Sequence, residues 1–139
     1  VFDFYDPIRH TEISIRRARK AYPAYPGTMH ISSGHLPERK NSASLIFLFL
    51  AAHEIRDAAE RTLFFKELKR TLSLHGCIIL TEHLRNVPNL MAYNIGFFHF
   101  FPEYAWRRNF REAGLSVEKE IRITPFIKTF ILSKHGTLH

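Results

Sequence analysis

The sequence predicts an α/β fold with a mostly parallel sheet that an antiparallel hairpin closes at the C-terminus. Two apolar runs, Leu45 to Ala52 and Cys77 to Thr81, are separated by a helix-like segment from Ala58 to Leu74. A strand buried on both faces reads as a continuous apolar run, and a crossover helix makes two such strands parallel. Near the C-terminus, a two-residue connection joins Leu115 to Ile123 with Phe126 to Ser133, which makes that pair antiparallel.

The N-terminal third of the sequence predicts a strand, a helix and a second short strand. Val1 to Tyr5 is strand-like, and a proline soon afterwards stops it. Glu12 to Tyr22 is helix-like, with a threonine N-cap before it and a proline after it. Thr28 to Ser32 predicts a short strand, and Gly34 to Ser42 predicts a polar loop that leads into the first apolar run.

The C-terminal half predicts three helices between its strands. Ala58 to Leu74 carries apolar residues at helical spacing, and we expect Gly76 to end that helix. A short helix is expected from Asn89 to Phe98, and a longer one from Glu103 to Ala113, which Gly114 ends. With the short helix counted as part of a loop, the predicted order is β-α-β-β-α-β-α-β-β, and it shows no internal repeat or linker.

The composition indicates a single folded domain over residues 1–139. Hydrophobic residues make up 45% of the chain, which supplies enough apolar surface for a core and excludes disorder. The formal net charge of +7 gives a basic surface that could attract nucleic acid, an anionic membrane or an anionic cofactor. The basic clusters at Arg16 to Lys20 and at Arg107, Arg108 and Arg111 read as solvated helix faces, so nucleic-acid binding is not expected.

Cysteine usage and hydropathy favour a cytoplasmic protein. The single cysteine, Cys77, excludes an intrachain disulfide and a multi-cysteine zinc site. A chain without a disulfide framework fits an intracellular location. The longest apolar run, Leu45 to Ala52, is too short to span a bilayer, and the sequence starts without a signal-peptide pattern.

Both apolar runs end on a histidine and an acid. The first is followed by His53 and Glu54, and the second by Glu82 and His83. Parallel neighbours end at the same edge of a sheet, so we expect these side chains to meet where open α/β sheets bind ligands. His53, Glu54 and His83 are therefore candidate catalytic residues, because a histidine suits proton transfer near neutral pH.

Other roles fit the same strand ends. Arg56 and Arg85 follow the two pairs, so the glutamates could form an ion-pair network with them. Charged groups that converge on one edge need partners, and a ligand is one such partner, so Arg56, Glu82 and Arg85 are candidate substrate contacts. A zinc or iron site is a further alternative, built from either glutamate and three histidines, His53, His83 and His99. Their spacing is not diagnostic, and no metal is our expectation.

Three blocks of the sequence carry a family resemblance. Phe64 to Leu72, the following Gly76 and Ile78 to His83 form a helix–glycine–strand block, and Leu45 to Arg56 forms the strand before it. Together with the segment from Phe110 through the closing hairpin, they resemble the class I S-adenosylmethionine-dependent methyltransferases. The resemblance covers nearly the whole chain and implies a Rossmann-like sheet, S-adenosylmethionine as cofactor and methyl transfer to a small molecule.

The resemblance also implies where cofactor and substrate would bind. The family's second strand ends in an acid that pairs with the ribose hydroxyls, and both Asp3 and Asp6 fit that position, although one could simply cap the turn. Near the adenine and the methyl donor, the implied residues are Gly34, His35, Leu36, Ala51 and Ala52. Phe98 and His99 lie in an aromatic stretch where the family often builds its substrate pocket, although helix packing is the favoured explanation of such aromatics.

The family's first strand and its glycine-rich loop have no counterpart here. None of the six glycines forms a G-x-G cluster, the pattern that lets the backbone approach the cofactor closely. The first strand normally lies between the second and fourth, so its absence leaves two unpaired edges. Three outcomes are open: the complete protein supplies that strand, the Val1 strand pairs with the Leu45 strand, or a second copy fills the gap in a homodimer.

We therefore expect this chain to be a partial domain of a cytoplasmic S-adenosylmethionine-dependent methyltransferase. Two alternatives remain from the sequence alone. One is a truncated, non-catalytic module that dimerises through its exposed strand edges, and the other is an unrelated metal-assisted α/β hydrolase that uses the histidines.

Overall fold

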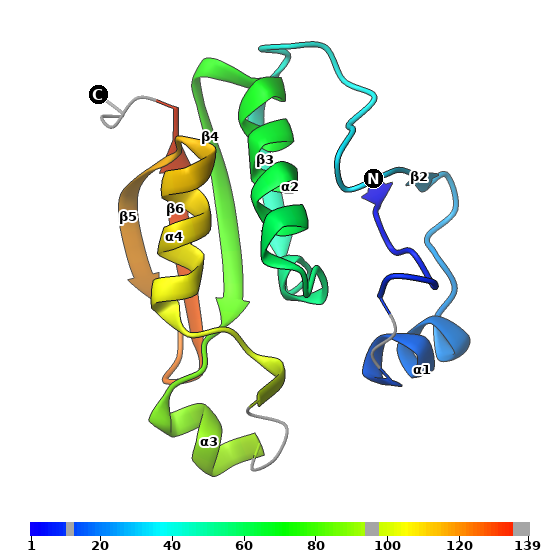
Figure 1. Ribbon diagram of the computed structural model, residues 1–139, viewed down its shortest axis with the longest axis vertical. Coiled ribbons are helices and arrows are strands. Elements are labelled where there is room, and N and C mark those ends of the chain that lie inside the picture. The colour runs from blue at the N-terminus through cyan, green and yellow to red at the C-terminus, as the bar shows by residue number, and fades with distance from the viewer. Residues whose placement is uncertain (11–12, 94–97, 135–139) are drawn as a thin grey trace.

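The computed structural model describes residues 1–10, 13–93 and 98–134, and Figure 1 shows their arrangement. In chain order the elements are β1 (Phe2–Asp3), α1 (Ile13–Ala21), β2 (Met29–His30), β3 (Ala43–Phe49), the 3-10 turn η1 (Ala52–Glu54), α2 (Ala58–Thr71), β4 (Leu72–His83), α3 (Val87–Tyr93), α4 (Glu103–Ala113), β5 (Ser116–Arg122) and β6 (Ile127–Ser133). The predicted α/β class is confirmed. None of the described helices is both long and apolar enough to cross a membrane.

Four strands form the larger sheet, in the order β3-β4-β6-β5. β3 and β4 are parallel, and Phe49 lies opposite Thr81 near their carboxyl ends. β6 runs antiparallel to both β4 and β5. The predicted parallel pair and closing hairpin are therefore confirmed, and the two strand ends that lead into the histidine–acid pairs lie side by side.

The N-terminal strands form a separate sheet. β1 and β2 pair in parallel, with Phe2 opposite Met29 and Asp3 opposite His30. Among the described strands, β1 pairs only with β2, so the expected alternative in which the Val1 strand closes against the Leu45 strand is wrong. Figure 1 shows these elements and α1 to the right of β3 and α2. On its outer edge β3 pairs with none of the described strands.

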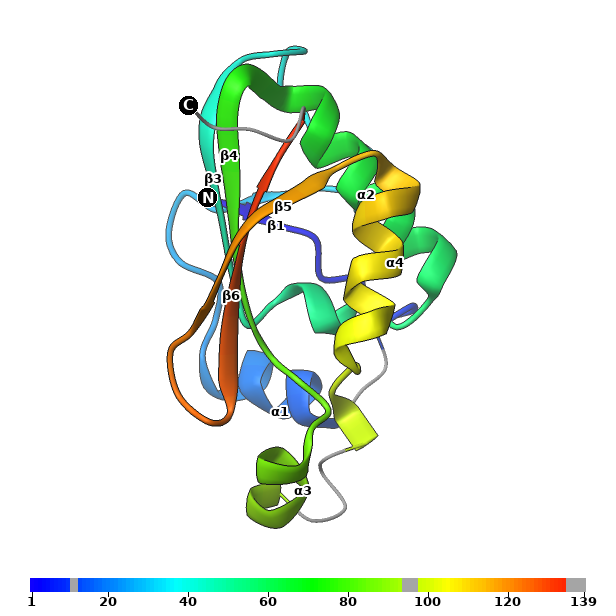
Figure 2. The same cartoon turned by 90° about the vertical axis from the view of Figure 1, so that its left-hand side faces the viewer.

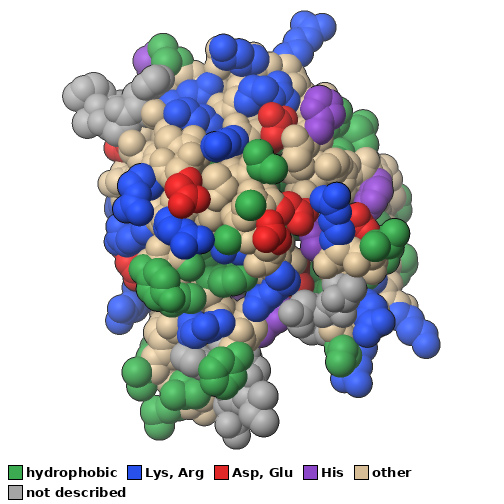
Figure 3. Space-filling view, in the orientation of Figure 1, with side chains coloured by type: hydrophobic (Ala, Val, Ile, Leu, Met, Phe, Trp, Pro, Cys, Tyr) green, Lys and Arg blue, Asp and Glu red, His purple; other side chains and the backbone are tan. Residues whose placement is uncertain are grey.

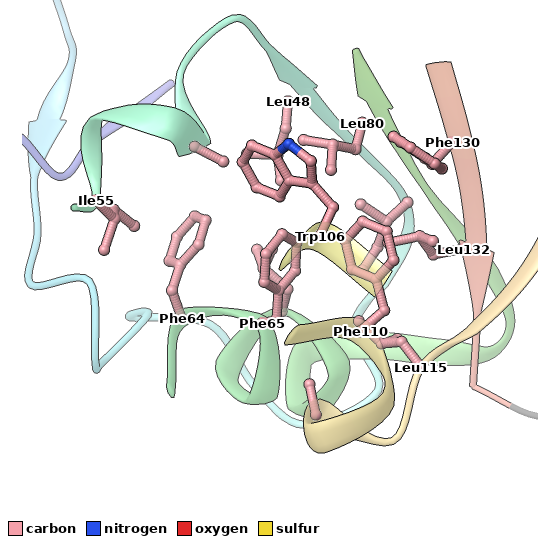
Figure 4. Packing of buried hydrophobic residues seen from close by; sticks show 14 of the residues in the cluster. Leu48, Ile55, Phe64, Phe65, Leu80, Trp106, Phe110, Leu115, Phe130 and Leu132 are labelled. Atoms are coloured by element: carbon pink, nitrogen blue, oxygen red, sulfur yellow. The ribbon is translucent and has the colours of Figure 1, made fainter. Parts of the chain in front are cut away.

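Both long helices cover one face of the larger sheet (Figure 2). The side chain of Asp57 caps α2 by accepting a hydrogen bond from the N–H of Glu60, and α4 ends at Gly114, whose φ of 71° is left-handed. Burial of a large apolar side chain stabilises the fold by about 1.5–3 kcal/mol. The buried cluster between helices and sheet includes Phe64, Phe65, Trp106, Phe110, Phe130 and Leu132 (Figure 4).

The opposite face of β3 stays open to solvent. Leu45, Phe47 and Phe49 alternate along that face with 47%, 53% and 60% of their surface exposed. Leu48, between them in sequence, points to the helix-covered side and is only 9% exposed. A strand that reads as apolar on both faces is thus covered on one face only.

One predicted element boundary is wrong for a clear physical reason. We expected Gly76 to end α2 and the next strand to start at Cys77, but β4 follows α2 without a break. Gly76 lies inside β4, where a Cβ would come within 2.9 Å of the carbonyl oxygens of Ala43 and Ser44. Those two residues lie at a register shift between β3 and β4, so the glycine permits a close approach of the two strands.

Other predicted element boundaries differ from the observed ones by a few residues. The first apolar run is a strand only as far as Phe49, and Ala52 already belongs to η1. The expected helix from Asn89 to Phe98 forms as α3, two residues earlier, and its predicted positions 94–97 lie outside the described residues.

Candidate functional site

A cavity of about 550 Å³ lies between the N-terminal elements and the carboxyl end of β3. Its walls include Asp3 at the end of β1, Arg19 of α1, and Leu50 and Ala51 after β3. Three further lining residues with ionisable side chains are His53, Glu54 and His99. The volume falls within the range of about 300–1,000 Å³ that is typical of small-molecule sites, and the position at the carboxyl ends of strands is the expected one.

Glu82, the penultimate residue of β4, is fully buried and organises the turn after β3. Its Oε2 accepts a hydrogen bond from Nδ1 of His53 at 2.6 Å. Its Oε1 accepts from the backbone N–H groups of Ala52 at 2.9 Å and His53 at 3.3 Å. One carboxylate therefore fixes both the backbone of η1 and the orientation of the imidazole. The other ring nitrogen of His53, Nε2, lies beside Glu54.

Glu54 connects two imidazoles at the cavity wall. Its Oε1 lies 3.3 Å from Nε2 of His53 and 3.5 Å from Nε2 of His99. The two rings meet edge to face, with centroids 5.0 Å apart. The second oxygen of Glu54, Oε2, is buried and has no hydrogen-bond partner within the described part of the chain.

The close contacts shift the pKa values of this cluster in opposite directions. Burial alone lowers the pKa of His53, but hydrogen bonds and charges from Glu54 and Glu82 outweigh it and raise this pKa to about 9. Burial alone raises the pKa of Glu54, but hydrogen bonds and charges from His53 and His99 lower it to about 2. At neutral pH the cluster therefore holds a cationic His53 beside an ionised Glu54.

Arg56 and Arg85 bind main-chain carbonyl groups in the segment that carries His99. Nη1 of Arg56 donates to the carbonyl of His99 at 2.5 Å and to that of His53 at 3.4 Å. Nε of Arg85 donates to the carbonyl of Phe100 at 2.7 Å, and its Nη2 donates to that of Phe98 at 2.7 Å. The arginines predicted as substrate contacts thus anchor the backbone around His99 to the two strand ends.

The other predicted catalytic and substrate residues lie beside the cavity. His83 stacks on Phe100, with centroids 4.8 Å apart, and does not line the cavity. Phe98 is largely exposed and lies outside the lining as well. Of the predicted catalytic set, the structure therefore brings His53 and Glu54 to the cavity, together with His99.

The two candidate ribose acids occupy different places. Oδ1 of Asp3 accepts hydrogen bonds from the N–H of Tyr5 at 3.0 Å and from Arg19 at 2.6 Å, and the residue lines the cavity. Oδ1 of Asp6 accepts from the N–H of Ile8 at 2.8 Å, which lowers the pKa of Asp6. Asp6 thus caps the turn before α1, away from the cavity.

Most of the predicted adenine-side residues also lie away from the cavity. Leu36 is in the core, and its N–H donates to Oε2 of Glu67 at 3.1 Å. Gly34 and His35 do not line the cavity, and Ala52 is completely buried, so that Ala51 alone of this predicted set is a lining residue. The sequence reasoning missed Arg19, because its helix position reads as solvent-facing and its partner lies 16 residues earlier.

This chain is similar to known proteins in structure, but no significant similarity in sequence was found. No protein-family model matches the chain, and no curated protein matches it significantly. A solved S-adenosylmethionine-dependent methyltransferase from Methanosarcina mazei has a TM-score of 0.68 at 15% identity, with 98% of this chain and 81% of that chain covered. A second, from Aquifex aeolicus, has a TM-score of 0.64 at 13% identity, with 94% and 65% covered.

The same fold also occurs in a structure described as a pericyclic reaction enzyme. Its TM-score is 0.60 at 13% identity, over 87% of this chain and 40% of that chain. This chain therefore has the Rossmann-like fold of class I S-adenosylmethionine-dependent methyltransferases, as the resemblance implies, and it spans only part of each of these solved chains. The fold alone does not determine the reaction, since one fold hosts several reactions.

Proposed function

We propose that this chain forms part of the active site of an S-adenosylmethionine-dependent methyltransferase that acts on a small molecule. The observation that carries the proposal is the cavity at the carboxyl ends of β1 and β3, within a fold that solved methyltransferases share over 94% to 98% of this chain. In open α/β sheets, ligands bind at that edge.

The cavity residues fit the adenosine half of the cofactor. Asp3 accepts two hydrogen bonds on one oxygen, and a carboxylate offers about four acceptor positions, so its second oxygen is suited to ribose hydroxyl groups. Phe4 and Leu50 give the cavity apolar walls against which a flat base can pack. The described glycines, at positions 27, 34, 76 and 114, do not line the cavity, so those parts of the chain offer no close backbone cradle for the methionine half.

The ionisable cluster would position the methyl acceptor. The bound cofactor supplies an electrophilic methyl group, and placing the acceptor in line with it accounts for much of the rate. Glu54, ionised and lining the cavity, is suited to accept a hydrogen bond from an acceptor hydroxyl or amine. His53 is protonated at neutral pH and Glu54, with a pKa of about 2, is a weak base, so we assign both residues to orienting the acceptor and not to removing its proton.

The acceptor is proposed to be small because the cavity, at about 550 Å³, has to hold it together with part of the cofactor. On the face seen in Figure 3, Lys and Arg side chains are scattered among acidic ones, without the single basic stripe that nucleic acid requires. We propose the cytoplasm as the location, where a lone thiol such as Cys77 stays reduced.

Calorimetric titration with S-adenosylhomocysteine tests the proposal. We expect binding to the chain, weakened about tenfold or more by Asp3→Ala, because a hydrogen bond to a charged group contributes about 1.5–3 kcal/mol. Asp6→Ala is the matched control and should leave the affinity unchanged. Absence of binding would exclude a cofactor site on this chain alone, and equal losses in both variants would contradict the role proposed for Asp3.

A further inference from the structure

We propose that His53, Glu54 and His99 form a binding site for a divalent first-row metal ion, with Zn²⁺ as the best-fitting example. One ligand atom from each residue lies within 4.8 Å of the others, and they are the only such group among residues 1–10, 13–93 and 98–134. Two imidazoles and one carboxylate are the ligand set of many catalytic zinc sites and of non-haem iron sites. The proposal stands whether or not the chain transfers methyl groups.

The distances match those of a ligand shell. Zinc–ligand bonds of about 2.0–2.1 Å in tetrahedral geometry place neighbouring ligand atoms about 3.4 Å apart. In the structure, Oε1 of Glu54 is 3.3 Å from Nε2 of His53 and 3.5 Å from Nε2 of His99. These two distances therefore already match those between neighbouring ligand atoms of a zinc ion. Only the distance between the two imidazole nitrogens would have to change when an ion binds.

The surroundings of the ligands are those of a built site. Nδ1 of His53 donates to the fully buried Glu82 at 2.6 Å, which is the carboxylate–histidine support that commonly orients a metal ligand. Arg56 donates to the carbonyls of both histidines, at 3.4 Å and 2.5 Å, and so fixes their backbones relative to each other. Burial limits the number of conformers each ligand can adopt, since His53 and Glu54 have side chains only 8% and 13% exposed.

An unsatisfied buried oxygen is the independent sign that a ligand belongs here. Oε2 of Glu54 is buried without a hydrogen-bond partner among the described residues, and an unpaired buried oxygen destabilises the folded state. Bidentate binding of a metal ion by this carboxylate would engage Oε2 as well as Oε1, and the ion would take the place of the proton on His53. Two carboxyl groups, of Glu54 and Glu82, would then offset the charge of a divalent ion.

The site would be open on one side. All three ligands line the cavity, so a fourth coordination position faces the space where a small molecule would bind. Water or an oxygen or nitrogen atom of a ligand could occupy that position, as it does in catalytic zinc sites. Imidazole ligands favour Zn²⁺, Fe²⁺ or Co²⁺ over Mg²⁺ and Ca²⁺, which prefer oxygen ligands.

The test is direct metal analysis of the full chain. After dialysis against Zn²⁺ and removal of the excess, we expect one ion per chain, and Co²⁺ in its place should give the visible absorption of a low-symmetry site. His99→Ala and the isosteric Glu54→Gln should each weaken binding about tenfold or more. His75→Ala removes an exposed histidine from β4 and should change nothing.

Circular dichroism of each variant confirms that it is folded before the metal is measured. Binding of less than one equivalent by the wild-type chain would overturn the proposal, as would full retention of the ion by His99→Ala or loss of the ion in His75→Ala. S-adenosylhomocysteine affinity measured with and without Zn²⁺ separates this site from the proposed cofactor site, because a metal site can exist without cofactor binding and the reverse also holds.

Discussion

Glu82 illustrates how a single buried side chain determines the local structure. It holds two backbone N–H groups and one imidazole, and it has no exposed surface. Glu82→Gln preserves the shape but removes the charge that strengthens all three bonds, so we expect a loss of about 2–3 kcal/mol in the free energy of unfolding. Urea denaturation measures it, and Glu38→Gln, at an exposed position, should stay within about 0.5 kcal/mol. Equal effects in both variants would contradict this role.

Part of this arrangement was predictable from the sequence. The meeting of His53 and Glu82 follows from parallel strands ending at one edge, and the structure confirms it. Period-two alternation would also have placed Glu82 on the buried face, since Ile78 and Leu80 precede it there. The partners of Arg56 could not be predicted, because its acceptor is a main-chain carbonyl 43 residues away that no side-chain pattern marks.

At the scale of elements, the close pairing of β3 and β4 depends on one residue, Gly76. A Cβ there would lie 2.9 Å from two carbonyl oxygens of β3, and neither backbone atom can move aside cheaply. We expect Gly76→Ala to lower the free energy of unfolding by about 1–3 kcal/mol. The control is Gly34→Ala, where the nearest atom is 3.9 Å away and the effect should be near zero. Thermal or urea unfolding of the two variants gives the comparison.

The two faces of β3 give a second comparison within one element. Leu48 is 9% exposed and belongs to the core, so Leu48→Ala should cost about 2–5 kcal/mol. Phe47 is 53% exposed on the uncovered face, and Phe47→Ala should cost less than about 1 kcal/mol. A large loss in the second variant, measured by denaturation at low protein concentration, would mean that the outer face is covered in solution.

Alternation of exposed and buried residues within β3 explains why the prediction of burial on both faces is wrong. An apolar run in a parallel sheet predicts burial on both faces, and the pattern in Leu45 to Ala52 is the same whether or not a second layer is present. The helix-covered face, the parallel register and the hairpin were predictable because they depend on neighbours within the chain. Phe47 and Phe49 are largely exposed, and a period-two pattern does not indicate whether a second layer covers their face.

At the scale of the whole molecule, the arrangement of the two sheets determines where a ligand can act. Strands β1 and β2 have two residues each, and the N-terminal unit, residues 1–10 and 13–36, contacts α2 through ring packing and hydrogen bonds. These include the rings of Phe4 and Phe64, 5.0 Å apart, and the hydrogen bond from Leu36 N–H to Glu67 at 3.1 Å. Because its two strands are short and pair with none of the described strands of the larger sheet, this unit is expected to open at a lower free energy than the four-stranded sheet.

Hydrogen exchange tests this expectation together with the cofactor proposal. The amides of Met29 and Ile31, which donate to the carbonyls of Val1 and Asp3, report the β1–β2 pairing and should exchange faster than those of β4. A ligand that contacts both Asp3 and the end of β3 binds only when the N-terminal elements are packed against the larger sheet. Saturating S-adenosylhomocysteine should therefore slow exchange of these amides by a factor set by the ratio of ligand concentration to Kd. Amides in the middle of β4 that exchange only through global unfolding should slow by the same factor, because global unfolding also releases the ligand, whereas amides that exchange through local openings away from the site should not change. Unchanged exchange at Met29 and Ile31 in the presence of bound ligand would show that the ligand does not occupy the space between the two sheets.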